Sequence, residues 1–423
     1  MALLRSTLGP LPARRMRSVA VRRSRVRRQL QVALCLGLME KFSAYRDPGT
    51  GIQPFSVPLP PTSTTGPLQA ITRVLGFGLG VFRTAIICSI ALLYLTLVEI
   101  LCLVLVPIPP LHRAITRVFT FVLAKLALWT LGIIWVPVET ITKKKIGRNA
   151  HRNEPWNPNA GDLIISNWAS WIEVLWLAAR CNPVFVLPVP ESIPKFEDTV
   201  HQPMPVTNRP GRATGTGSAN IQSIQKHSAV PVVPIKGFRR VSLLRMICLA
   251  GRVPPFFKDE SGTSSLDEIR KSAGRPVVVF PECTTSNGRG LLRFANVFNE
   301  EVPVKGYQVF IMCVRYDPPT LYTPTLTRPV GIPGPAFLNP LSHIFEIASS
   351  VVPLTVSIRL LPPSESPGSQ LFLASDYVKG GSGEDQLAES SASLISQIGR
   401  LKRTGLGWED KASFFHYRNL KFV

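Results

Sequence analysis

A cluster of hydrogen-bond donors follows a short apolar segment in the second half of the chain. Residues 277–280, Val-Val-Val-Phe, are typical of a strand buried on both faces of a mostly parallel sheet, and Pro281 ends it. The loop after it offers hydroxyl, amide, guanidinium and backbone N–H groups; its candidate substrate-binding residues are Glu282, Cys283, Thr284, Thr285, Asn287 and Arg289. Because ligands of open α/β sheets bind beyond the carboxyl ends of strands, this loop is placed to hold a phosphate.

A second group of candidate residues follows another predicted strand. Residues 163–166 predict this strand, and residues 169–180 predict the helix after it. The candidate catalytic residues are Asn167, Trp168, Ser170 and Glu173. Glu173 could act as a general base if burial raised its pKa from about 4.3 toward neutrality, or it could be a helix residue paired with a cation. Trp168 could line a lipid slot or be a core aromatic residue, and Asn167 and Ser170 are also ordinary residues for a helix start.

Short strands and helices alternate along the rest of the chain. We predict strands at 184–187, 230–235, 309–314 and 354–361, and helices at 240–250, 265–274 and 387–401. Ser265 and Glu268 have the spacing of a capping box at a helix start. Alternation of this kind indicates a three-layer α/β domain, with a mixed, mostly parallel sheet flanked by helices.

Two long apolar segments precede this domain. Residues 84–108 carry one charge, Glu99, and residues 118–138 carry one charge, Lys125, so each segment is long enough to cross about 30 Å of hydrocarbon. The connection at 109–117 is short and contains two prolines, which fits a helical hairpin, and the flanking basic residues favour both ends in the cytosol. Two alternatives stay open: two buried helices of a soluble domain, and a hairpin that re-enters the membrane or lies at its surface.

The charge distribution points to lipid rather than nucleic acid. The formal net charge is +22, and residues 1–38 contain nine arginines and no acidic residue. The sequence has no zinc-finger spacing, RNP-type aromatic strand or regular basic helix face, so nucleic acid is not an expected partner. A basic, apolar chain is more typical of a protein that faces anionic lipid. Seven scattered cysteines without a Cys-x-x-Cys pair indicate a reducing compartment, and no metal site is implied.

These features divide the chain into four parts. They are an arginine-rich arm at 1–38, an irregular lead-in at 39–67, the membrane hairpin at 68–140, and an α/β domain at 141–423 with a flexible insertion at 190–226. The arm is typical of a transit-like segment that is removed, or else translation starts at Met39. Both interpretations exclude the arm from the fold.

The two polar stretches resemble the signature of the PlsC-type glycerolipid (1-acylglycerol-3-phosphate) acyltransferases. That family has Asn-His-x-Ser-x-x-Asp opening a helix after a strand, then Phe-Pro-Glu-Gly-Thr-Arg in a loop after a later strand. Here residues 167–173 read Asn-Trp-Ala-Ser-Trp-Ile-Glu, and residues 280–285 read Phe-Pro-Glu-Cys-Thr-Thr. Residues 39–42 and 46–55 further resemble a divergent fungal lysophosphatidic acid acyltransferase branch linked with vacuolar protein sorting.

The resemblance implies a fold and a reaction. The fold is a PlsC-like acyltransferase domain preceded by a two-helix membrane hairpin. In this family a histidine takes the proton from a glycerol hydroxyl as the hydroxyl attacks the thioester of acyl-CoA, and an acidic residue five positions later orients the histidine. The Glu-Gly-Thr-Arg loop binds the glycerol phosphate. The resemblance therefore implies acyl-CoA as a co-substrate and no bound cofactor.

The chain departs from this signature at the positions that carry the chemistry. Trp168 stands at the place of the histidine, and indole cannot accept a proton at neutral pH. Glu173 replaces an aspartate that is shorter by one methylene. Cys283 replaces the glycine, where it packs as a small residue or acts as a nucleophile. Thr285 replaces the arginine, and Arg289 could supply the missing cation.

Two functions follow as hypotheses. The first is a membrane-bound acyltransferase that moves a fatty acyl group from acyl-CoA to a hydroxyl of lysophosphatidic acid or a related lysophospholipid. It would act at the endoplasmic reticulum or lipid droplet, with its catalytic domain facing the cytosol and membrane lipids as partners. The second, motivated by Trp168, is a catalytically impaired protein of the same fold that binds lipid and acts in lipid or vacuolar trafficking.

Overall fold

The computed structural model describes the greater part of the chain. The described residues are 45–61, 67–142, 154–194, 231–255, 262–370, 372–373 and 385–418, with residues 67–70 described by their backbone alone. The arm at 1–38 lies outside the described residues, and so does most of the predicted insertion at 190–226. Contacts group Asp47–Val423 into one compact unit, to which all the elements below belong.

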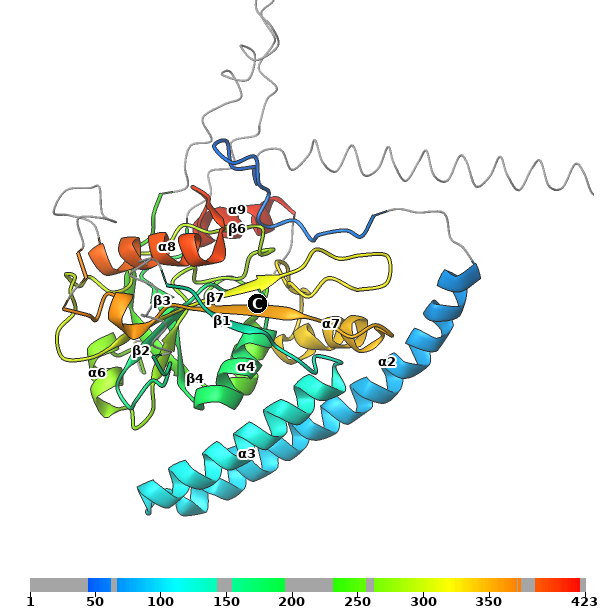
Figure 1. Cartoon of the computed structure of the whole chain (residues 1–423), viewed down its shortest axis with the longest axis horizontal. Helices are drawn as coiled ribbons and strands as arrows, with labels where there is room; N and C mark the ends of the chain where they lie inside the picture. The colour runs from blue at the N-terminus through cyan, green and yellow to red at the C-terminus, as the bar shows by residue number, and fades with distance from the viewer. Residues whose placement is uncertain are drawn as a thin grey trace, which may run out of the picture. The chain divides into compact units, whose positions relative to one another are not determined.

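A seven-stranded sheet forms the centre of this unit (Figure 1). Its strand order is β1-β8-β7-β2-β5-β3-β4. The strands are β1 (Val138–Thr140), β2 (Leu163–Ser166), β3 (Val184–Pro190), β4 (Ile235–Val241), β5 (Val277–Val279), β7 (Val309–Tyr316) and β8 (Val356–Leu360). Neighbours pair in parallel except β7 with β8 and β3 with β4, which are antiparallel. The predicted mixed, mostly parallel sheet flanked by helices is therefore confirmed.

Helices cover both faces of the sheet. Successive apolar residues of a strand point to opposite faces, so Ile164 belongs to the hydrophobic cluster on one face and Leu163 and Ile165 to the cluster on the other. The first cluster contains residues of α3 (Pro109–Thr130), α4 (Ile172–Cys181), α5 (Leu243–Leu249) and α7 (Asn339–Ala348). The second contains residues of α6 (Leu266–Ser272), α8 (Gln386–Gly399) and α9 (Trp408–Tyr417). This is the three-layer arrangement that the alternation of elements predicts.

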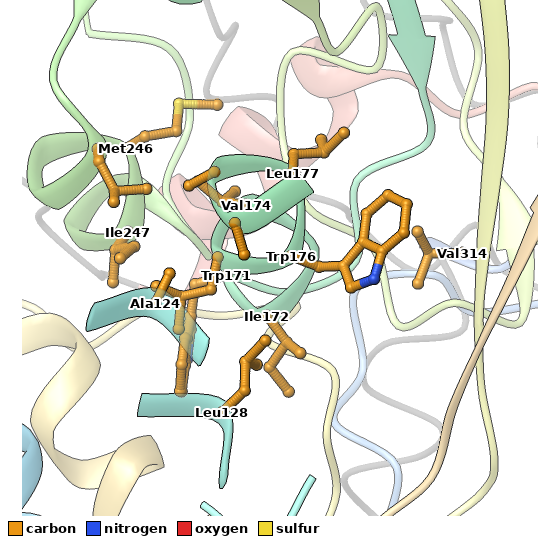
Figure 2. Packing of buried hydrophobic residues seen from close by; sticks show 14 of the residues in the cluster. Ala124, Leu128, Trp171, Ile172, Val174, Trp176, Leu177, Met246, Ile247 and Val314 are labelled. Carbon is orange, nitrogen blue, oxygen red and sulfur yellow. The ribbon is translucent and has the colours of Figure 1, made fainter. Parts of the chain in front are cut away.

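Helix α4 lies at the centre of the first cluster (Figure 2). Met246 and Ile247 of α5 pack on one side of it, and Ala124 and Leu128 of α3 pack on another. Each of these four side chains is buried. Because α4 is enclosed in this way, packing holds it in one position against the sheet. The turn that precedes α4 is held in place with it.

One predicted strand is wrong in its position. The strand expected at 230–235 instead spans Ile235–Val241, and the helix expected at 240–250 is Leu243–Leu249. Pro231 and Pro234 lack the N–H that a strand ladder requires, which keeps the apolar run between them out of the sheet. The true strand is the edge strand of the sheet beside β3, with a single further bridge from Phe238 to Ser264, and it carries exposed basic residues, so its sequence does not look apolar. By contrast, the capping box predicted at Ser265 and Glu268 is present.

The two long apolar segments form helices that begin earlier than predicted. Helix α2 (Pro67–Tyr94) continues through a π-helical stretch, Leu95–Ile100, and a 3₁₀ stretch, Leu101–Leu105. Helix α3 starts at Pro109, within the segment expected to be the connection, because proline is tolerated in the first turn of a helix. Among the described residues only Ile71–Leu105 has the length and hydropathy to cross a membrane. The expectation of two such helices is therefore met by the first alone, since α3 is more basic along its length.

Helix α2 packs closely on α7 within the α/β domain. A Cβ atom at Gly76 would lie 2.6 Å from the carbonyl oxygen of Ser349, so this glycine lets the two segments approach. Arg83 Nη1 donates to the carbonyl oxygens of Ala348 at 3.3 Å and Ser350 at 2.8 Å. These two hydrogen bonds cap the carboxyl end of α7. One side of α2 is thus attached to the domain along part of its length.

The outer side of α2 and α3 is apolar and exposed. It includes Val74, Leu75, Phe77, Val81, Phe82, Leu92, Leu103, Val104, Val118, Phe121, Val122 and Leu126. Exposed apolar surface continues on residues next to and within α7, among them Phe337 and Leu341. Exposed apolar side chains gathered on neighbouring helices in this number are typical of a membrane or protein contact.

Candidate active site

The two predicted stretches meet at the carboxyl ends of adjacent parallel strands. Strand β2 leads into residues 167–171, and its neighbour β5 leads into residues 280–289. The backbone N–H of Trp168 donates to Oε2 of Glu282 at 2.6 Å, and the backbone N–H of Ser286 donates to the carbonyl oxygen of Trp168 at 3.0 Å. The structure therefore brings residues 114 positions apart into direct contact.

Glu282 connects these stretches through both of its carboxyl oxygens. Oε2 accepts from Trp168, and Oε1 accepts from the backbone N–H of Leu292 at 2.8 Å. The side chain is buried, and burial raises the pKa of Glu282 to about 8, while the two N–H groups lower it and the nearby Glu173 raises it. The buried carboxyl group of Glu282 therefore links the loop to the turn before α4 through hydrogen bonds.

Glu173 holds the same turn from the other side. Its Oε1 accepts from the backbone N–H groups of Ala169 at 2.6 Å and Ser170 at 2.7 Å, and its Oε2 accepts a hydrogen bond from the hydroxyl of Tyr316. Burial raises the pKa of Glu173 to about 7, although all three donors lower it. A carboxyl group poised near neutrality can both take and release a proton at physiological pH. The alternative prediction of a partner cation finds no support, because the donors to Glu173 in this part of the chain are two N–H groups and a hydroxyl.

Trp168 fills the space beside these carboxyl groups. Its indole ring is stacked on Phe280 with ring centroids 5.1 Å apart, and its Nε1–H donates to the carbonyl oxygen of Ser170 at 2.9 Å. Only 1% of the residue is exposed. Of the two predictions for Trp168, the buried position matches the core aromatic residue. The side chain at the position where the resembled signature has a histidine is therefore fully packed and offers no acceptor.

Asn167 and Ser170 shape the turn from within. The amide of Asn167 exchanges two hydrogen bonds with the backbone of Val314, 3.0 Å from Nδ2 to the carbonyl oxygen and 2.8 Å from the N–H of Val314 to Oδ1. This side chain thus continues the pairing of β2 with β7 for one residue beyond the strand. Ser170 is buried, and its hydroxyl lies beside that of Tyr316. Because residues 167–171 form this turn, α4 begins at Ile172, three residues later than predicted.

A buried lysine contacts the donor-rich loop, and the sequence did not indicate it. Lys411 of α9 donates from Nζ to Oγ1 of Thr284 and to the carbonyl oxygen of Thr285, both at 2.7 Å. It is completely buried, and burial lowers its pKa well below the ordinary value, while Glu282 raises it. Lys411 thus contacts Thr285, the residue that replaces the arginine of the signature that the sequence resembles. Arg289, the predicted substitute, is exposed and does not reach this position.

Two other loop residues serve the architecture. Cys283 has φ +57°, a left-handed backbone conformation that glycine adopts without strain and that residues with a Cβ rarely adopt. Its thiol is buried, and burial raises the pKa of Cys283 well above the ordinary value, which favours packing over nucleophilic chemistry. Asn287 donates from Nδ2 to the carbonyl oxygens of Gln53 at 2.8 Å and Ser56 at 3.1 Å. Asn287 therefore fastens the lead-in to the loop instead of facing an open pocket.

A segment after β7 covers the turn. The backbone N–H of Arg328 donates to the carbonyl oxygen of Ala169 at 2.8 Å, and the hydroxyl of Thr285 donates to the carbonyl oxygen of Arg328 at 2.5 Å. Next to it, His343 of α7 accepts at Nδ1 from Nε1 of Trp171 at 2.9 Å, so its remaining proton is on Nε2, 3.0 Å from the carbonyl oxygen of Thr325. Burial lowers the pKa of His343 to about 3, so this histidine is neutral and structural.

The site approaches solvent at Gly288 and Tyr316. Both are only partly buried, whereas Glu173 and Glu282 are fully enclosed. A Cβ atom at Gly288 would lie 3.7 Å from Cβ of Ala169 and 3.9 Å from the ring of Tyr316, so the loop, the turn and the end of β7 converge here. Of the two residues that share the hydrogen bond between Tyr316 and Glu173, Tyr316 is therefore the more exposed.

Comparison of the chain with known protein families, with curated proteins and with solved structures finds no match. Within the described residues, no group of three or more His, Cys, Asp or Glu side chains is arranged to hold a metal ion.

Proposed function

We propose that this chain is a membrane-associated acyltransferase that transfers a fatty acyl group from acyl-CoA to a free hydroxyl of lysophosphatidic acid or a related lysophospholipid. The observation that carries the proposal is the contact between Trp168 and Glu282, which joins the two stretches that resemble the PlsC signature. Their meeting point at the carboxyl ends of parallel strands is where α/β folds bind ligands.

In this proposal Glu173 is the general base and Tyr316 passes the proton to it. The lysolipid hydroxyl attacks the thioester carbon, so an oxygen–carbon bond forms and the carbon–sulfur bond breaks. The hydroxyl proton moves to the oxygen of Tyr316 while the proton of Tyr316 moves to Oε2 of Glu173, along the hydrogen bond already present. Glu173 later returns its proton by the same route, and the CoA thiolate leaves as the thiol. A Glu173 pKa of about 7 suits both steps.

The phosphate of the acceptor would lie at the partly exposed end of the loop. Gly288 brings backbone close to Tyr316, and the exposed guanidinium of Arg289 follows it directly. Arg289 could pair with a phosphate in the two-pronged manner that guanidinium groups favour. The buried donors Thr284 and Lys411 would then maintain the shape of the loop without touching substrate.

The exposed apolar side of α2 and α3 supports a membrane location. Because the opposite sides of these helices pack on α7 and α4, the proposal favours a hairpin lying in the membrane surface over one that crosses the bilayer. We place the protein at the endoplasmic reticulum or lipid droplet with its α/β domain facing the cytosol. The substrates, both amphiphiles, would then reach the site from the lipid layer.

The test is an acyl-transfer assay with purified full-length protein. Oleoyl-CoA and lysophosphatidic acid are incubated with the parent, with Glu173→Gln and with Tyr316→Phe, and phosphatidic acid is measured. Glutamine can accept both backbone N–H groups that Glu173 accepts, so the fold is retained while the base is lost. We expect a rate at least about 100-fold lower for Glu173→Gln. If the parent forms no more phosphatidic acid than a blank without protein, the acyltransferase proposal is refuted for these substrates. If Glu173→Gln transfers the acyl group as fast as the parent, the assignment of Glu173 as the general base is refuted.

The buried indole favours a second candidate function, a protein of this fold that binds lipid without transferring an acyl group. The observation that favours this second candidate is the stacking of Trp168 on Phe280, because the buried indole leaves no basic group at the position of the family's histidine. Trp168→His discriminates the two candidates, because it retains the backbone contact to Glu282 and restores an imidazole. Activity that appears only in Trp168→His favours the second candidate, whereas activity already present in the parent favours the first.

A further inference from the structure

A pocket of about 530 Å³ lies between α3 and α4, away from the candidate active site. Its lining residues are Arg117, Val118, Phe121, Lys125, Trp176, Ala179 and Arg180. The pocket is at the end of α4 opposite to Glu173, and a helix rise of about 1.5 Å per residue puts Arg180 about 10 Å along the axis from Glu173. A volume of this size accommodates part of a small amphiphile.

The two helices contribute matching combinations of side chains. Arg117, Phe121 and Lys125 are four residues apart and so lie on one side of α3, while Trp176 and Arg180 have the same spacing on α4. Each helix therefore presents an aromatic residue beside a cation. The result is an apolar floor with three positive charges around it.

These cations have no anionic partner within the described part of the chain. Arg117 and Arg180 are exposed and Lys125 is partly buried, and no ion pair within 4.0 Å links any of the three to a described carboxylate. Arg180 and Arg117 both act on the nearby thiol of Cys181, where they lower a pKa that burial raises to about 11. The local potential is therefore positive and unneutralised.

The pocket opens onto the apolar surface of the hairpin. Val118 and Phe121 line it and also belong to the exposed side of α3, with 59% and 49% of their surface accessible. An occupant that satisfies both features needs a negative head and an apolar tail. Free phosphate would pair with the cations but leave the apolar side chains of the pocket in contact with water. A zwitterionic lipid would place its own positive group beside the three cations of the pocket, which is electrostatically unfavourable.

We propose that this pocket binds the phosphate headgroup of an anionic phospholipid drawn from the membrane, with the first part of the acyl chains lying against Val118 and Phe121. The site is separate from the base and the phosphate loop of the proposed reaction. It therefore fixes the hairpin to anionic membrane whether or not the protein transfers acyl groups.

The test measures binding of short-chain lipids to the purified full-length protein below their micelle concentrations. Dihexanoyl phosphatidic acid, dihexanoyl phosphatidylcholine and inorganic phosphate are compared by isothermal titration. We expect saturable binding of phosphatidic acid and binding of the other two at least about tenfold weaker. In the triple variant Arg117→Ala, Lys125→Ala, Arg180→Ala, the affinity for phosphatidic acid should fall at least about tenfold.

A matched control removes the same charge elsewhere. Lys271→Ala, Lys305→Ala and Lys402→Ala change three exposed lysines outside α3 and α4, and this variant should bind phosphatidic acid like the parent. Val118→Trp retains all three cations and fills the pocket from an exposed position, so it should also weaken binding. Equal losses in the two charge variants would overturn the proposal, as would equal affinity of the parent for phosphatidylcholine. Binding of inorganic phosphate as tight as that of phosphatidic acid would reduce the pocket to a simple anion site and overturn the lipid assignment.

Discussion

Replacing Glu173 by glutamine should change how the stability of the protein depends on pH. Burial raises the pKa of Glu173 from its ordinary 4.5 to about 7, despite three hydrogen-bond donors. The folded state therefore binds a proton more tightly than the unfolded state does. As pH rises from about 4.5 to about 7, the unfolded state loses this proton first, and the free energy of unfolding falls. At about 1.4 kcal/mol per pH unit, the fall attributable to Glu173 is about 3 kcal/mol.

Glutamine carries no proton in this range, so the variant lacks this decline. The difference in free energy of unfolding between Glu173→Gln and the parent should grow in favour of the variant by about 3 kcal/mol between pH 4.5 and pH 7. In a chain of this size that corresponds to a relative rise in Tm of about 3–6 °C. The contribution of Glu282, which shifts in the same direction, is present in both proteins and largely cancels from the difference.

The assay is thermal unfolding in mild detergent at pH 5, 6, 7 and 8, with Glu301→Gln as the matched control. Glu301 is exposed, so its side chain meets water in both the folded and the unfolded state. Parallel Tm curves for the parent and Glu173→Gln would show that Glu173 is ionised throughout this range. That result would refute the argument that desolvation outweighs the three donors, and with it the assignment of Glu173 as a base near neutrality.

Three further expectations follow from the same site. Lys411→Met should lower the free energy of unfolding by about 3 kcal/mol in chemical denaturation, because the buried oxygens of Thr284 and Thr285 then lose their hydrogen-bond donor. The control Lys271→Met, at an exposed position, should change the free energy of unfolding by less than about 0.5 kcal/mol. Equal effects of the two substitutions would contradict the structural role of Lys411. Asn287→Ala should speed amide hydrogen exchange in residues 50–57, which its side chain holds, and unchanged exchange would contradict that contact. If the parent transfers acyl groups, its rate should rise as pH passes about 7, because a base must be deprotonated; a rate that falls over this interval would exclude Glu173.

The parts of the fold that could be predicted are those governed by local pattern. The apolar, β-branched runs of β2 and β5 and the capping box of α6 need only neighbouring residues, and all of them lie where expected. The juxtaposition of the two polar stretches could also be expected, because carboxyl ends of parallel strands share one edge of a sheet. Strand β4 could not be placed, since an edge strand tolerates charges that remove the apolar signal.

The remaining parts of the site depend on contacts between distant residues. Lys411 reaches Thr284 across 127 positions, and Tyr316 reaches Glu173 across 143. Nothing in the local sequence of α9 distinguishes a lysine that becomes buried from one in water. The structural role of Asn287 could not be predicted either, because its hydrogen-bond partners Gln53 and Ser56 lie on the lead-in, far from Asn287 in the sequence. Composition identified the donors of the loop correctly but could not reveal that most of them point inward.

The contact of Lys411 with the loop has a consequence for how the protein is made. Thr284 leaves the ribosome 127 residues before its buried partner, so the nascent loop must wait for α9. Until then its carbonyl and hydroxyl groups lack their donor, and water or a chaperone must cover them. A fusion tag or truncation that disturbs α9 would therefore impair maturation of a site far upstream, even though the coding sequence of that site is intact.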